Sequence, residues 1–99
     1  MPQYTASVTS STAGGYLPFV DSHATGIVFK ARMVRIYNTG SSDGVWVNFC
    51  TTTATTGDWR VSAGTSEIIT VAMEDRYFSG LSYTSTAASA APFRVLAIG

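Results

Sequence analysis

Residues 26–36 read GIVFKARMVRI, and the spacing of their apolar side chains decides the fold. From residue 27 to residue 31 every second side chain belongs to one apolar set, which is the period of a β-strand. The set then changes phase by one residue and continues at Val34 and Ile36. A change of phase near residues 32–33 predicts a bulge or corner, where one long strand serves two sheets.

The other periodic stretches also favour strands over helices. We expect a β-hairpin over residues 34–50, strands at 59–61 and 68–73, a weaker strand at 77–83 and a last strand at 93–98. The strand at 68–73 is apolar on both faces, so we expect both faces to be covered. No stretch has a sustained helical period with caps, and β-branched and aromatic residues dominate. The sequence therefore predicts an all-β protein with one antiparallel β-sandwich or jelly-roll-like domain over residues 26–99.

The first 25 residues differ in composition from the rest. Residues 5–15 are small and polar, with one large apolar side chain, and such a segment buries too little area to order itself. A dense apolar patch follows at residues 16–20, where Pro18 suits an edge strand or a docked extended segment. We therefore expect an extended N-terminal arm and anchor segment over residues 1–25, which contacts a neighbouring subunit through Tyr4, Tyr16, Leu17 and Phe19.

The charge content is low for a small domain. The 99 residues are 45% apolar and carry six basic and six acidic side chains, so the formal net charge is zero. The surplus apolar surface indicates contact with another subunit, and a zero net charge gives no basic field for nucleic acid. The five arginines form no stripe, which leaves two interpretations: interface residues that bind a partner's carboxylates, or plain surface residues. The N-terminus has no basic region of the kind that begins a signal peptide, and no membrane span is visible in the sequence. We therefore expect cytoplasmic synthesis and no membrane partner.

Three apolar side chains point away from the expected core. Trp46 lies on the opposite parity to its neighbouring valines, and an outward Trp anchors a protein interface, stacks on a sugar ring or is covered by its own chain. Leu96 and Ile98 lie opposite the inward side chains of the last strand. Because a two-layer sandwich covers one face of each sheet, we expect a neighbouring subunit or the arm to cover Leu96 and Ile98.

No group of residues points to catalysis or to metal binding. The single histidine, His23, is two residues from Asp21, but no third ligand or nucleophile lies at a recognisable spacing. The single cysteine, Cys50, is typical of a small buried hydrophobe. The acidic residues are scattered, and most adjoin turn residues. We therefore expect no catalytic, cofactor-binding or metal-binding residue and no enzymatic activity.

The order of strands and turns from residue 34 to residue 99 resembles that of small β-sandwich virion proteins of tailed bacteriophages. The segments that carry the resemblance are RIYNTG at 35–40, VWVNF at 45–49, TAT at 53–55, VSAG at 61–64 and VLAIG at 95–99. The resemblance implies a capsid decoration or cement protein, displayed as a homo-oligomer with a trimer favoured. Its partner would be the major capsid protein or another virion protein on the shell, reached after synthesis in the host cytoplasm.

Two other functions remain open at this point. A receptor-binding or carbohydrate-binding module of a phage tail fibre or spike would use Trp46 and exposed tyrosines as stacking platforms. An enzyme is the third alternative, and it would need a nucleophile, base or metal set that the sequence pattern does not assemble. Glycan binding by the isolated protein would favour the module, whereas cosedimentation with intact shells would favour the decoration protein.

Overall fold

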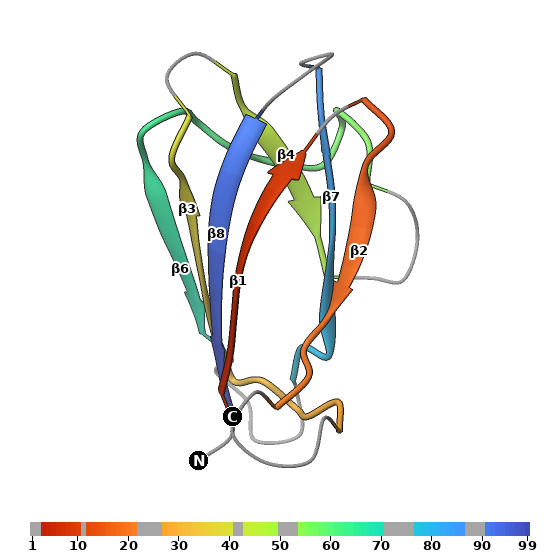
Figure 1. Cartoon of the computed structure of the whole chain (residues 1–99), viewed down its shortest axis with the longest axis vertical. Helices are drawn as coiled ribbons and strands as arrows, with labels where there is room; N and C mark the ends of the chain where they lie inside the picture. The colour runs from red at the N-terminus through yellow and green to blue at the C-terminus, as the bar shows by residue number, and fades with distance from the viewer. Residues whose placement is uncertain are drawn as a thin grey trace.

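The computed structural model describes residues 3–10, 12–21, 27–40, 43–49, 54–70, 77–86 and 91–99. Within these ranges the chain forms eight strands and no helix, and the strands make two four-stranded antiparallel sheets (Figure 1). Sheet A has the order β1 (Gln3–Ser10), β8 (Ala91–Ile98), β3 (Met33–Asn38), β6 (Ser66–Thr70). Sheet B has the order β2 (Gly15–Pro18), β7 (Gly80–Ser85), β4 (Val45–Asn48), β5 (Trp59–Val61). The prediction of an all-β sandwich is confirmed.

The strand pairing is nested along the chain. β1 pairs with β8, β2 with β7, β3 with β6 and β4 with β5, and these pairs alternate between the two sheets. The β3–β8 and β4–β7 ladders complete the two sheets. Each of the four strands in the first half of the chain is therefore paired with a strand of the second half.

The core lies between the sheets because side chains alternate along each strand. In β8, Phe93, Val95 and Ala97 are buried, whereas Arg94 is exposed. Tyr83 of sheet B packs edge-on against Phe93, with 5.1 Å between the ring centroids. The buried apolar cluster contains Phe19, Ala31, Val34, Ile36, Val45, Val47, Val61, Leu81, Ala91, Phe93, Val95 and Ala97.

The corner predicted at residues 32–33 is present. Ala31 forms an isolated bridge with Phe78, just before β7 of sheet B. One residue later, the backbone N–H of Arg32 donates to the carbonyl oxygen of Ile98 in sheet A at 2.8 Å, and β3 starts at Met33. The change of phase in the sequence therefore marks the place where the chain passes from one layer to the other.

The hairpin predicted over residues 34–50 is wrong, because β3 belongs to sheet A and β4 to sheet B. Asn38, fully buried at the end of β3, fixes this crossing through three hydrogen bonds. Its Nδ2 donates to the carbonyl oxygens of Asp43 at 2.8 Å and Val61 at 3.0 Å, and its Oδ1 accepts from the Gly40 N–H at 2.9 Å. The turn-forming composition of this loop is compatible with a hairpin and with a crossing, so composition alone did not separate them.

The N-terminal arm predicted over residues 1–25 is not confirmed. β1 is paired with β8 along its full length, and β2 is paired with β7. Tyr4, Ala6 and Val8 are partly buried on the inner side of β1 and alternate with exposed Thr5, Ser7 and Thr9. An edge strand needs only one apolar face and a backbone ladder, so small polar residues on its other face do not prevent it from ordering.

Two further sequence expectations concern β6 and the loops. The expectation that both faces of the strand at 68–73 are covered is wrong for Ile68, which is 62% exposed because β6 is the edge strand of sheet A. Ile69 packs against the core from the other face. Residues 71–73, His23 and Cys50 lie outside the described residues.

Candidate interaction surface

The outer face of sheet A brings together side chains from four strands. Across the central row, Leu96 of β8 lies between Thr5 of β1 and Arg35 of β3, and Arg35 is followed by Ile68 of β6. The adjacent rows are Ser7, Arg94, Tyr37 and Ser66 on one side, and Gln3, Ile98, Met33 and Thr70 on the other. This surface, called face A below, therefore combines apolar residues with two arginines.

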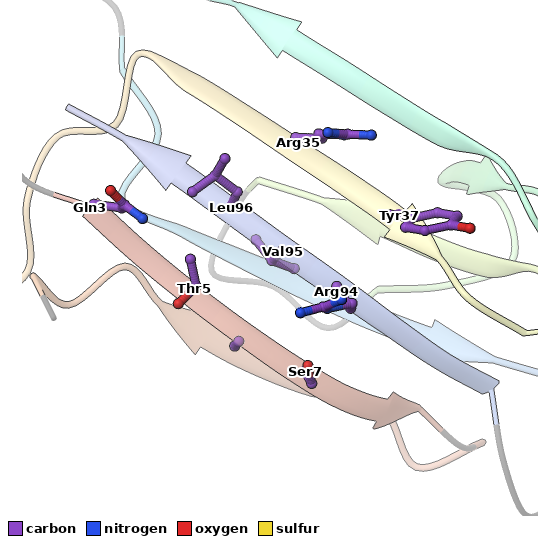
Figure 2. A pocket seen from close by; sticks show the side chains of 9 residues that line it. Gln3, Thr5, Ser7, Arg35, Tyr37, Arg94, Val95 and Leu96 are labelled. Atoms are coloured by element: carbon purple, nitrogen blue, oxygen red, sulfur yellow. The ribbon is translucent and has the colours of Figure 1, made fainter.

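A groove of about 620 Å³ runs over this part of face A. Figure 2 shows Arg35, Tyr37, Arg94 and Leu96 on β3 and β8, with Gln3, Thr5 and Ser7 along β1. The groove residues are Gln3, Thr5, Ala6, Ser7, Arg35, Tyr37, Arg94, Val95 and Leu96. Its polar groups are hydrogen-bond donors or neutral side chains, because no carboxylate lines it.

The two arginines of face A are exposed and lack partners among the described residues. In the described strands, no acidic side chain shares their face: Glu67 of β6 lies opposite Ile36 and so is on the inner parity. The groove is therefore a site of positive potential on a chain whose net charge is zero.

The predicted interface residues Leu96 and Ile98 lie on face A, as the alternation in the last strand indicated. Both are half-buried, while Ile68 in the same sheet is largely exposed and Tyr37 is 40% exposed. Face A therefore leaves apolar area open next to the two guanidinium groups.

On the outer face of sheet B, called face B below, larger side chains partly cover the small residues of the central strand. The central strand β7 has small outward residues, and Tyr16 and Trp46 come from the strands on either side of it. The Tyr16 hydroxyl lies against Gly80, and Trp46 is opposite Thr84, which is buried. The Arg60 guanidinium in turn lies over the Trp46 ring, 5.5 Å from its centroid. Trp46 is therefore partly covered by its own chain and remains half-buried.

Face B also pairs its polar groups internally. Asn48 Nδ2 donates to Asp58 Oδ2 at 3.0 Å, and the Thr55 backbone N–H donates to the same oxygen at 2.8 Å. These two bonds, with that from Thr55 the stronger influence, hold the pKa of Asp58 below its usual range. An aspartate held in this way stabilises its own loop.

The remaining predicted interface residues have roles inside the molecule. Phe19 is fully buried, Leu17 packs against the core, and Tyr4 lies 5.8 Å from Phe19 between ring centroids. Burial, followed by the neighbouring Tyr83, raises the pKa of the Tyr4 hydroxyl. The structure therefore places Phe19 in the core and Tyr4 and Leu17 partly buried against it, whereas Tyr16 is 40% exposed on face B.

Two observations concern other kinds of site. The described residues contain no group of three or more His, Cys, Asp or Glu side chains arranged to hold a metal ion. In the same part of the chain, no helix is long and apolar enough to cross a membrane.

Comparison of the chain with protein-family models, with curated proteins and with solved structures gives no match.

Proposed function

We propose that this chain is a non-enzymatic virion structural protein, a capsid decoration or cement protein that binds the phage shell through face A. The observation that carries the proposal is the contrast between the outer faces: on face B the larger side chains lie against one another and over the small residues of β7, whereas face A has the largely exposed Ile68 and two arginines without partners. A surface of this composition is suited to a protein partner.

The strand order supports the proposal. We interpret the nested pairing, which alternates between the two sheets, as a jelly roll of eight strands. Jelly rolls are common in viral capsid domains and in lectins. The sequence resemblance to small virion proteins favours the first of these two classes.

The edges of the sheets support assembly into a homo-oligomer. Among the described strands, β1 is a long edge strand without charge or proline, a composition that leaves an edge open to pairing with another chain. The other three edge strands carry features that disfavour pairing with another chain. In β6 the charged Glu67 is on the inner side, β2 contains Pro18, and β5 is short. We propose that the β1 edge of one copy contacts a different surface of the next copy, which is the head-to-tail arrangement that a closed trimer, the state favoured by the resemblance, requires.

Cosedimentation with intact shells that lack the protein tests the proposal. Wild-type protein should bind at a fixed stoichiometry, and Leu96→Ser should bind about tenfold more weakly because it removes apolar area from the contact. Arg60→Ala, a change on face B, is the matched control and should bind like the wild type. Failure of the wild type to bind shells, together with glycan binding that depends on Trp46, would replace the proposal with the carbohydrate-binding alternative.

Native mass spectrometry tests the assembly. A trimer at micromolar concentration is expected, and a stable monomer under the same conditions would contradict association along β1.

A further inference from the structure

We propose that the groove on face A binds an extended acidic segment of the partner protein, with two carboxylates two residues apart. This inference rests on the proposed function for the identity of the partner, since it assigns the part of the shell protein that face A contacts. The ligand class itself follows from the geometry of the two arginines.

The spacing of the arginines sets the spacing of the carboxylates. Arg35 is opposite Leu96, and Arg94 is opposite Tyr37, so the two arginines are diagonal neighbours on adjacent antiparallel strands. Diagonal positions of this kind are about 7–8 Å apart. In an extended chain, residues i and i+2 project to the same side and are separated by about 6.6 Å. An acidic residue at both positions therefore matches the two guanidinium groups, which suit bidentate contact with carboxylates.

The rest of the groove fits the remainder of an extended segment. Leu96 is half-buried, lies opposite Arg35 and is two residues from Arg94 on the same face of β8. It therefore provides apolar contact next to both arginines. Thr5 and Ser7 line the β1 side, and their hydroxyl groups donate to or accept from a bound backbone. The site thus combines two charged contacts with the apolar surface of Leu96 and the hydroxyl groups of Thr5 and Ser7.

A second copy of this chain does not carry the required motif. The acidic residues of the whole sequence are Asp21, Asp43, Asp58, Glu67, Glu74 and Asp75, and no two of them are two residues apart. The groove also lacks the run of basic residues that nucleic acid requires, because Arg35 and Arg94 are its two cations. The occupant that fits is therefore an acidic segment of a different protein.

Titration calorimetry with synthetic peptides tests the ligand class. The probe is a ten-residue peptide of Thr and Val with one acidic–X–acidic motif at its centre, titrated into the full-length chain. We expect binding that weakens with salt and falls about tenfold or more when both acidic residues are replaced by their amides, as for charge-assisted hydrogen bonds. A peptide with the same two acidic residues placed next to each other should also bind more weakly.

Variants of the groove complete the test. Arg35→Gln and Arg94→Gln should each weaken binding of the acidic–X–acidic peptide about tenfold. The control is Arg60→Gln, which changes an exposed arginine on face B and should leave the affinity for the peptide unchanged. Equal affinity for the acidic and amide peptides, or unchanged affinity in both groove variants, would overturn the inference.

Shell binding separates this inference from the proposed function. If shells bind the wild type and both arginine variants equally, the acidic-segment inference fails and the decoration function stands. If the peptide binds as expected but no shell does, the groove assignment stands and the decoration function fails.

Discussion

Face A and face B are built from the same alternating strands, yet they use their outward side chains differently. On face B the central strand β7 has Gly80, Ser82 and Thr84 facing outward, and these small residues let larger side chains from neighbouring strands cover them. On face A the central strands β8 and β3 have long outward side chains, and three of these, Arg35, Tyr37 and Arg94, are exposed.

The difference shows how one fold separates stability from recognition. The aromatic and polar groups of face B contact one another, so they contribute to the stability of the single chain. The apolar area and the arginines of face A contribute little within the chain and are available for contact between chains. A substitution on each face is therefore expected to affect a different measurement.

The largest expected effect is a loss of folding stability at the crossing between the two sheets, which affects both faces. Asn38→Ala removes the buried amide that bonds to Asp43, Val61 and Gly40. Buried backbone groups lose their partners, so we expect the free energy of unfolding to fall by about 3 kcal/mol. Urea denaturation followed by circular dichroism measures this change, and a loss below about 1 kcal/mol would contradict the role of Asn38 at the crossing.

The next change acts on face B alone. In Gly80→Ala, the new Cβ would lie 2.9 Å from the Leu17 carbonyl oxygen and would collide with the Tyr16 hydroxyl. We expect about 1–3 kcal/mol of destabilisation from this overpacking, with shell binding by the folded fraction preserved. The control is Gly57→Ala, because a Cβ there meets its nearest atom at an ordinary 3.6 Å. Equal stability of the two variants would show that the small residues of β7 do not matter for face B.

The sequence predicted the class of fold because period-two alternation is a local property. The inward and outward sides of the last strand, and with them the outward positions of Leu96 and Ile98, follow from neighbouring residues alone. The corner at residues 32–33 also appears as a local change of phase. Features that depend on which strands become neighbours do not follow from this local pattern.

The groove and the N-terminal strand could not be predicted in this way. Arg35 and Arg94 are far apart in the sequence and meet only because β8 pairs with β3. β1 is ordered by its ladder with β8, at the other end of the chain, although its own composition resembles that of a flexible arm. In both cases the missing information is long-range strand pairing, which alternation does not specify.

A smaller effect is expected from uncovering Trp46 on face B. Arg60→Ala removes the guanidinium that lies over the indole ring, a contact worth about 0.5–1 kcal/mol at an exposed site. In a Trp59→Phe background Trp46 is the single tryptophan, so its fluorescence emission should shift to longer wavelength. An unchanged emission maximum would mean that Arg60 does not shield Trp46 from water.

The smallest expected effect is a pH dependence at Asp58. Its pKa is lowered in the folded state by the bonds from Thr55 and Asn48, so the stabilisation is present above the unfolded value of about 3.8. The stabilisation is lost as the pH falls through the lower folded value. The urea midpoint of the wild type should therefore decline more between about pH 6 and about pH 3 than that of Asp58→Asn. Parallel declines would contradict the paired state of Asp58.

Hydroxyl-radical footprinting of the shell-bound protein tests the central claim most directly, because each face carries one tyrosine of equal exposure. Tyr37 on face A and Tyr16 on face B are both 40% exposed. On binding to the shell, oxidation of Tyr37 should fall several-fold together with that of Met33, while oxidation of Tyr16 should stay the same. Protection of Tyr16 with Tyr37 still oxidised at its free rate would contradict face A as the interaction surface.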